Sequence, residues 1–287
     1  LARLNYDGSL DSTFNPGSGA DNPVYAVAQS PVDGKILVGG AFGRLNGVTF
    51  NGVGRLNTDG TPDTTFNPGG LGANGTVYAL AMQTDGKVII GGDFTAVNGT
   101  SCNHLARLNT DGSVDTTFNL GTGANDTVRA VAIQLDGRIL IGGQFTSYNG
   151  TSFVRVGRVN SDGSADTGFS PGQGANEMVT CIALQTDNRI LLGGQFTRCS
   201  GVFRNHLTRL NPDGTVDPTI NFGTGANDYV AAVVAQESTI SGYPSDVPDE
   251  KIIIGGVFDQ FNGQVHKHLA RIYGGSISGS GAFQFSQ

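Results

Sequence analysis

The sequence predicts an all-β fold, a five-bladed β-propeller of four-stranded antiparallel blades. One phrase, written Leu105-Ala-Arg-Leu-Asn-Thr-Asp-Gly-Ser-Val-Asp-Thr-Thr-Phe118 in one copy, recurs around Arg3, Arg55, Arg107, Arg158, Arg209 and Arg271. A second phrase, Gln-x-Asp-Gly-Lys/Arg-apolar-Gly-Gly-x-Phe, alternates with it and ends at Phe42, Phe94, Phe145, Phe196 and Phe258. No segment has helical periodicity. A fixed period of this length is typical of repeat architectures, and four antiparallel strands per repeat, arranged radially, form a propeller.

The second complete repeat shows the expected elements in order. Residues 77–83 alternate and are rich in strand formers, so they predict the innermost strand. The turn signal Thr84-Asp85-Gly86 separates them from a second strand over 87–94. The loop 95–103 leads to a third strand over 104–109, and the turn Thr110-Asp111-Gly112 leads to a fourth over 113–118. A glycine-rich connection over 119–125 then enters the next repeat.

The x-Asp-Gly triplets set the register of each hairpin. Three-residue hairpin loops favour glycine at a left-handed position, and Asn188, which replaces glycine in one copy, tolerates that position well. Centring each turn on its aspartate predicts one cross-strand ion pair per copy. These pairs are Arg3–Asp11, Arg55–Asp63, Arg107–Asp115, Arg158–Asp166 and Arg209–Asp217. A matched arginine in every copy indicates a structural role for these carboxylates.

Small residues in the innermost strands favour a propeller over a β-sandwich or a solenoid, because strands around a narrow axis need slim side chains. The alanines are Ala26, Ala28, Ala79, Ala81, Ala130, Ala132 and Ala183. The last repeat supplies only three strands, so we expect Ser9–Phe14 to provide its fourth and to close the ring. Leu1–Asn5 then duplicates Leu269–Tyr273, and a propeller of six or more blades remains the alternative.

Composition excludes several classes of function. The net charge of -7 and a charged fraction of 14% do not provide the basic surface that nucleic-acid binding needs. No apolar run reaches the roughly 20 residues of a membrane-spanning helix. The sequence starts within a repeat at Leu1, so we expect a longer natural chain.

The two phrases resemble the delta-60 repeat, a β-propeller repeat of large bacterial surface and secreted proteins. The resemblance covers residues 1–273, and it implies a secreted or cell-surface location more than it implies a mechanism. Residues 274–287 form a second region, a Gly/Ser-rich linker followed by Ala282–Ser286, which resembles the first strand of a Calx-β-type domain. The expected partners are therefore other domains of the same long chain.

The loops opposite the x-Asp-Gly turns vary between copies, and variable loops on a constant scaffold are typical of binding surfaces. Aromatic and histidine side chains gather in these loops and suggest sugar binding. The candidate ligand-binding residues are Phe50, His104, Tyr148, Phe153, Phe203, His206 and Phe261. The absence of tryptophan weakens a lectin interpretation, and packing against the blade ends is the competing role.

Acidic residues precede the inner strands of four repeats, at Asp21, Asp126, Glu177 and Asp228. If they face the axis, their oxygens could bind a hard cation such as Ca²⁺, whereas solvated turn residues are the alternative. No other cofactor is indicated. A zinc site at His104, His206 and His268 is disfavoured, because the other repeats carry Gly52 and Arg155 at that position.

From these patterns we expect a non-catalytic structural or adhesive module of a bacterial extracellular protein, with surface glycans or proteins as possible ligands. The nearly identical blades argue against an enzyme. Two alternatives stay open. One is a multivalent lectin-like propeller, and the other is a glycosidase-like propeller with axial carboxylates such as Glu177 and Asp228.

Overall fold

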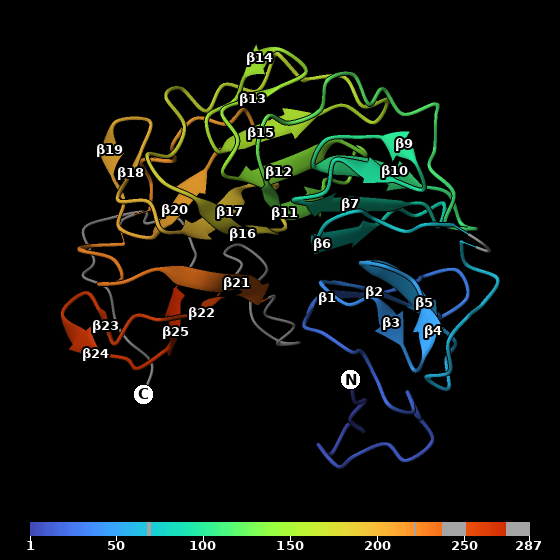
Figure 1. Cartoon of the computed structure of the whole chain (residues 1–287). Helices are drawn as coiled ribbons and strands as arrows, with labels where there is room; N and C mark the ends of the chain where they lie inside the picture. The colour runs from blue at the N-terminus through green and yellow to red at the C-terminus, as the bar shows by residue number, and fades with distance from the viewer. Residues whose placement is uncertain (68–69, 221, 237–250, 274–287) are drawn as a thin grey trace.

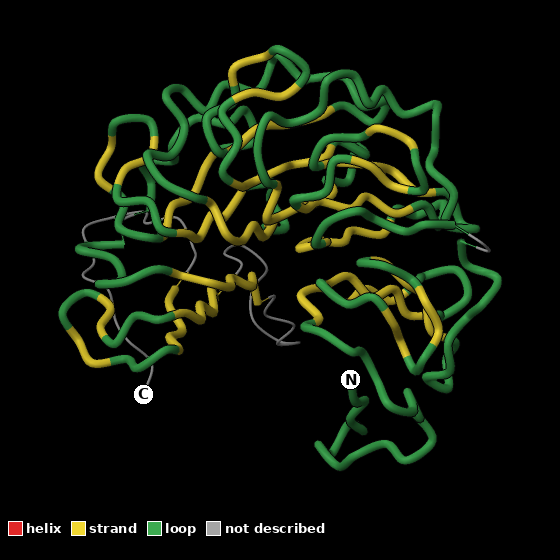
Figure 2. The backbone as a smooth tube through the Cα atoms, in the orientation of Figure 1, coloured by secondary structure: helices red, strands yellow, loops and turns green. Residues whose placement is uncertain are grey.

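The computed structural model describes residues 1–67, 70–220, 222–236 and 251–273. Five three-stranded antiparallel sheets follow one another around a central space, and no helix occurs in these ranges (Figures 1 and 2). The expected linker and Calx-β-like segment, 274–287, lie outside the described residues. The all-β propeller fold predicted from the repeats is confirmed.

Each sheet, or blade, uses the same three strands. The first and innermost strands are β1 (Val24–Gln29), β6 (Val77–Met82), β11 (Val128–Ile133), β16 (Val179–Leu184) and β21 (Val230–Gln236). The central strands are β2 (Ile36–Gly40), β7 (Val88–Gly92), β12 (Ile139–Gly143), β17 (Ile190–Gly194) and β22 (Lys251–Gly256). The third strands are β5 (Val53–Leu56), β10 (Leu105–Leu108), β15 (Val156–Val159), β20 (Leu207–Leu210) and β25 (Leu269–Tyr273).

The expected loops between second and third strands contain small hairpins of two-residue strands. These are β3 (Arg44–Leu45) with β4 (Val48–Thr49), β8 (Ala96–Val97) with β9 (Thr100–Ser101), β13 (Ser147–Tyr148) with β14 (Thr151–Ser152), β18 (Arg198–Cys199) with β19 (Val202–Phe203), and β23 (Gln260–Phe261) with β24 (Gln264–Val265). They lie away from the central space (Figure 1). The sequence indicated only loops here, because strands this short carry no alternation.

In the first four blades the expected fourth strand is reduced to one bridge, such as Leu108 with Val114. The reason is the aspartate that follows. Asp115 Oδ1 accepts hydrogen bonds from the backbone N–H of Thr117 at 2.9 Å and from its hydroxyl at 2.6 Å. Phe118 N–H also donates to the Asp115 carbonyl. The side chain therefore turns the backbone away from the sheet after a single pair.

The same aspartates form the predicted ion pairs in all five copies. Arg209 Nε lies 2.7 Å from Asp217 Oδ2, and both side chains are 1% exposed. A second cation that the sequence did not reveal also reaches four of the aspartates, as Lys35 reaches Asp63 at 2.7 Å. Burial alone would raise the pKa of Asp63, but hydrogen bonds from Lys35, Thr65 and Arg55 outweigh it and hold the pKa well below its ordinary value.

Four of the arginines in the Arg–Asp pairs also join successive blades. Nη1 of Arg55 donates to the carbonyl of Thr110, in the turn of the next blade, at 2.6 Å. Arg3, Arg107 and Arg158 repeat this bond to Thr58, Ser161 and Pro212, each at 2.6 Å. We call this arrangement the blade latch, meaning one arginine that binds its own aspartate and the next turn.

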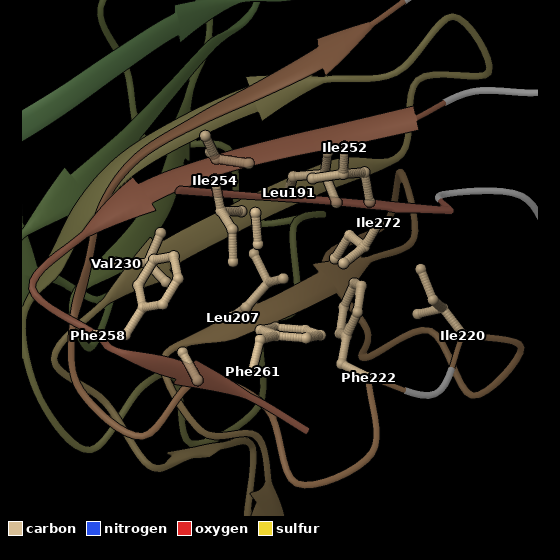
Figure 3. Packing of buried hydrophobic residues seen from close by; sticks show 13 residues of the cluster. Leu191, Leu207, Ile220, Phe222, Val230, Ile252, Ile254, Phe258, Phe261 and Ile272 are labelled. Atoms are coloured by element: carbon tan, nitrogen blue, oxygen red, sulfur yellow. The ribbon is translucent and has the colours of Figure 1, made fainter. Parts of the chain in front are cut away.

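The hydrophobic core of each blade from the second to the fifth includes residues of the preceding blade. In the last blade, Ile252, Ile254, Phe258 and Phe261 pack with Leu191 and Leu207 of the preceding blade (Figure 3). Glycine makes this close approach possible. A Cβ on Gly142 would come within 2.7 Å of Val179 Cγ1 in the next blade. The Gly-Gly pairs thus serve packing between blades.

In Figure 1 the described parts of the last and first blades lie apart, and the N-terminal segment lies beside the first blade. Within the described residues, Leu4 pairs with Leu10, and Phe14 packs into the first core with Val38, Phe42 and Leu45. No strand pairing joins residues 9–14 to the described part of the last blade. Closure of the ring by these ends therefore stays a prediction.

Candidate functional site

The structure places most of the predicted ligand-binding aromatics inside the blades. Phe50, Tyr148, Phe153 and Phe261 are buried. Tyr148 forms a β-bridge with Ala124, which lies just before the first strand of the same blade. The equivalent hairpin residues of the other blades, Leu45, Val97, Cys199 and Phe261, each form the same bridge with an alanine. Their hydrophobic packing explains why the side chains are apolar. Their assignment to ligand binding stays a prediction.

The remaining residues of that predicted set lie nearer the surface. Phe203 is 67% exposed, and the guanidinium carbon of Arg198 lies 3.9 Å above the centre of its ring. Nδ1 of His104 lies 3.2 Å from the carbonyl oxygen of Gly92, and His206 makes the equivalent contact with Gly194 at 3.1 Å. A carbonyl oxygen can only accept, so Nδ1 carries the proton in each imidazole. The two histidines thus perform the same structural task in separate blades.

Asp21 does not share the place of the other three predicted metal ligands. Its Oδ1 accepts the backbone N–H groups of Gly43 and Arg44, at 2.9 and 3.0 Å. Asn74 accepts the equivalent pair in the second blade, from Thr95 and Ala96. Asp21 therefore replaces an asparagine that caps the hairpin, and its pKa is lowered chiefly by the N–H of Arg44.

Asp126, Glu177 and Asp228 do occupy equivalent exposed places, one residue after that asparagine. Asp228 borders a pocket of 340 Å³ with Asp259, Lys267 and His268. Across the ranges that the structure describes, no group of three or more histidine, cysteine or acidic side chains is arranged to hold a metal. Calcium binding at the four acids stays a prediction.

The sequence interpretation missed a cluster on the innermost strands. Every first strand has a β-bulge, located between Val77 and Ala79 in the second blade. The bulged residues are Tyr25, Tyr78, Arg129, Thr180 and Ala231. The residue type at this position changes from blade to blade, whereas the residue before it is always valine and the residue after it is alanine in four of five blades. Bulges often re-aim a side chain beside a functional site. The change of residue type at this one strand position was the signal in the sequence that could have revealed the cluster. A strict alternation of inward and outward side chains along the strand does not predict it.

Three of these bulge residues contact one another across adjacent blades. The ring centres of Tyr25 and Tyr78 are 5.1 Å apart, and the guanidinium carbon of Arg129 lies 3.8 Å from the centre of the Tyr78 ring. Tyr25 is 53% exposed. We call these three residues the axial cluster, because their strands line the central space (Figure 1).

A polar bridge connects the axial cluster to a pocket at the seam of the first two blades. The hydroxyl of Tyr78 donates to Asp93 Oδ2 at 3.3 Å, and Asp93 Oδ1 accepts the N–H of Thr76. Thr76 and Gly75 line the pocket, which has a volume of 440 Å³ and also includes Asn51, Leu71 and Asn74. An aromatic surface and a cation are therefore linked to a hollow through Asp93 and Thr76. Such an arrangement can bind a small polar ligand.

The cysteines provide no reactive group. Cys102, Cys181 and Cys199 are unpaired thiols. Burial raises the pKa of Cys102 and Cys199 to about 11 and that of Cys181 to about 12. The thiols remain protonated near neutral pH and are poor nucleophiles.

Comparison with solved structures finds other propellers. A catalytically inactive form of virginiamycin B lyase from Staphylococcus aureus, solved with quinupristin, has a TM-score of 0.50 and 15% identity, over 91% of this chain and 70% of that one. The extracellular domain of the two-component system BT3049 from B. thetaiotaomicron has a TM-score of 0.50 and 16% identity, over 93% of this chain and 29% of that one. A further match is the WD40 β-propeller domain of Doa1, and the present chain covers 54% of the length of that structure. The search of curated proteins found no match.

These comparisons correct one expectation. The like blades suggested that the chain is not an enzyme, and that inference is wrong, because virginiamycin B lyase has the same kind of fold. Propeller architecture therefore does not show that a chain lacks catalytic activity. Identities of this size establish the fold alone. In the part of the chain that the structure covers, no helix has the length and apolar character needed to span a membrane.

A family of β-propeller domains of unknown function (DUF5122) matches the repeats directly. Its profile matches residues 1–14, 33–66, 83–118, 134–169, 185–219 and 248–272, which is more than half of the chain. The matched segments contain both repeated phrases, so the expected repeat-propeller family is confirmed. The chain belongs to this DUF5122 β-propeller family.

Proposed function

We propose that the chain is a ligand-binding, adhesive module of a secreted or cell-surface protein, and that it binds surface glycans at the axial cluster and the adjoining seam pocket. The observation that carries the proposal is the break in the repeat at the bulge. Two tyrosines and an arginine come together there, whereas the neighbouring strand positions keep their small or branched side chains.

The geometry suits a sugar. An exposed aromatic ring offers a flat apolar surface to the C–H groups of a pyranose, and the carboxylate of Asp93 offers an oxygen acceptor nearby. The seam pocket is large enough for one or two sugar residues. The resemblance to surface-protein repeats supports an extracellular setting, as does the similarity in fold to an extracellular domain from B. thetaiotaomicron.

A glycan array screened with the full chain tests this function, followed by calorimetry on the strongest ligand. Tyr25→Ala should weaken binding at least about tenfold, because an aromatic ring contributes a large part of the contact with a ligand. Tyr6→Ala is the matched control, since Tyr6 is fully exposed in the N-terminal turn and far from the bulges in sequence. Absence of glycan binding, or equal loss in both variants, would overturn the proposal.

A further inference from the structure

The guanidinium of Arg129 lacks the aspartate partner that the arginines of the repeated Arg–Asp pairs have. The arginines at positions 3, 55, 107, 158 and 209 each bind an aspartate at 2.7 to 2.8 Å. In the described residues Arg129 has no ion-pair partner, and its Nε is buried without a hydrogen bond. Its guanidinium carbon lies 3.8 Å from the centre of the Tyr78 ring. The cation is thus held in place, and its terminal Nη groups donate to no acceptor among the described residues.

Such an arrangement is costly unless something completes it. A buried donor without an acceptor loses its hydration and gains nothing in return. Packing alone does not require arginine at the bulge, because Thr180 and Ala231 occupy the same position in later blades. Thr180 satisfies its hydroxyl internally, by donating to the carbonyl of Val230 at 2.6 Å. Arg129 has no comparable acceptor within the described chain.

From this we infer that Arg129 binds the carboxylate of an acidic sugar, so that the ligand of the axial cluster is a uronic-acid-containing glycan. This inference rests on the proposed function and specifies its ligand. Guanidinium is planar and presents paired donors to a carboxylate, which makes it the suitable side chain for this group. Stacking on Tyr78 fixes the plane of the guanidinium before the ligand arrives, which lowers the entropic cost of binding.

The surrounding charges place the carboxylate at Arg129 and the hydroxyl groups elsewhere. Asp93 lies on the Tyr78 side of the cluster and is held by Tyr78 and Thr76. It would repel a carboxylate and accept hydrogen bonds from sugar hydroxyls. With a net charge of -7, the chain has no general attraction for polyanions, so recognition must come from a specific cation.

The test compares oligogalacturonate with the same oligosaccharide after reduction of its carboxyl groups, using calorimetry on the full chain. We expect the acidic form to bind at least about tenfold more tightly than the reduced form, as charge-assisted hydrogen bonds require. Arg129→Met should abolish this preference, and Arg129→Lys should retain part of it. Arg44→Met is the matched control, because Arg44 is an exposed arginine of β3, in a hairpin that lies away from the central space.

The outcomes separate the two proposals. Equal affinity for the acidic and reduced forms, with both lost in Tyr25→Ala, would overturn the role of Arg129 and leave glycan binding intact. No binding to either form, combined with an array that shows no ligand sensitive to Tyr25→Ala, would overturn both. The comparison of the two ligands uses the unaltered protein, so it stays decisive even if Arg129→Met fails to fold.

Discussion

At the residue scale, Asp217 shows how many polar contacts one repeated side chain can make. Its carboxylate accepts from Arg209 at 2.7 Å and from the hydroxyl and N–H of Thr219 at 2.7 and 2.8 Å. Arg189 approaches the same carboxylate at 3.2 Å. Asp217 is therefore an acceptor for three side chains and one backbone group, and its loss would leave a buried guanidinium without its charge partner.

Asp217→Asn should lower the free energy of unfolding by about 3–5 kcal/mol, the usual cost of breaking a buried ion pair from one side. Urea denaturation followed by circular dichroism measures this. Asp11→Asn is the matched control, since the same motif is open to solvent there, with Arg3 38% exposed. Equal effects at the two sites would show that burial does not determine the strength of the pair.

The same carboxylates predict the response to acid. Burial would raise the pKa of Asp63, Asp115 and Asp217, but hydrogen bonds to the charged form outweigh it and lower all three. The unfolded chain, with an aspartate pKa of about 3.9, then binds more protons than the folded chain in acid. Stability should be constant above about pH 5 and fall steadily below about pH 4.

Melting temperatures measured between pH 7 and pH 2.5 test this dependence. Asp115→Asn should melt lower at pH 7 and lose less on acidification than the unaltered chain, because one of the titrating groups is gone. A melting temperature that does not change down to pH 3 would contradict the assignment of these pKa shifts.

At the scale of elements, close contact between blades depends on the first glycine of each Gly-Gly pair. Gly142 lies in β12 with an ordinary backbone conformation, so space alone decides which side chain fits. A methyl group there would overlap Val179 of β16 and come within 3.1 Å of Ile182. In the last blade, the nearest atom to a methyl on Gly255 is the His268 carbonyl at 3.7 Å.

Gly142→Ala should destabilise the chain by about 1–3 kcal/mol, the usual cost of overpacking. Gly255→Ala should have almost no effect if the ring is open, and a cost similar to that of Gly142→Ala if Gly255 packs against Val24 of the first blade. Thermal unfolding of both variants measures the difference. If Gly142→Ala leaves the stability unchanged, the third and fourth blades can move apart to accommodate the methyl group, contrary to the expectation from the short distances to Val179 and Ile182.

At the scale of the whole molecule, the two ends of the array complement each other. The first residue of the third strand, Val53, Leu105, Val156 or Leu207, is at most 2% exposed because it enters the core of the next blade, whereas Leu269 is 64% exposed. Among the described residues Asp11 pairs only with Arg3, whereas each of the other four aspartates also binds a lysine or arginine at the start of the second strand of its blade. Lys251 stands at that position in the last blade.

We therefore expect the ring to close, with Gly255 against Val24 and Lys251 beside Asp11. Leu1–Leu4 and Leu269–Ile272 would compete for one place beside β22, so one of them must leave it. Cysteines at positions 255 and 24, in a background without the three native thiols, should form a disulfide within one chain. Positions 142 and 179, already in contact, are the positive control.

Non-reducing electrophoresis and mass spectrometry distinguish the outcomes of this cross-linking. A compact monomer that reducing agent converts to the ordinary form supports closure. Disulfide-linked dimers would instead mean that the last blade meets the first blade of a second copy. If the control pair forms its disulfide and the terminal pair forms none, the ends do not meet.

The sequence by itself determined the repeat, the strand order within each blade, the turn residues and the five Arg–Asp pairs. These features depend on contacts between residues near in sequence, where side-chain periodicity and turn chemistry are enough. The latch to the next turn, the second cation on four of the five aspartates and the burial of Phe50, Tyr148, Phe153 and Phe261 were decided only by the tertiary structure. They depend on how whole blades pack.

The candidate site shows the same division more sharply. Loop aromatics attract attention in a sequence, but whether a ring faces solvent or a core depends on the hairpin that carries it. The axial cluster joins residues of three blades through a bulge, and a bulge shifts the strand register without leaving a clear mark in the sequence. Only the assembled structure brings Tyr25, Tyr78 and Arg129 together, because their contact needs three separate repeats to meet around one axis.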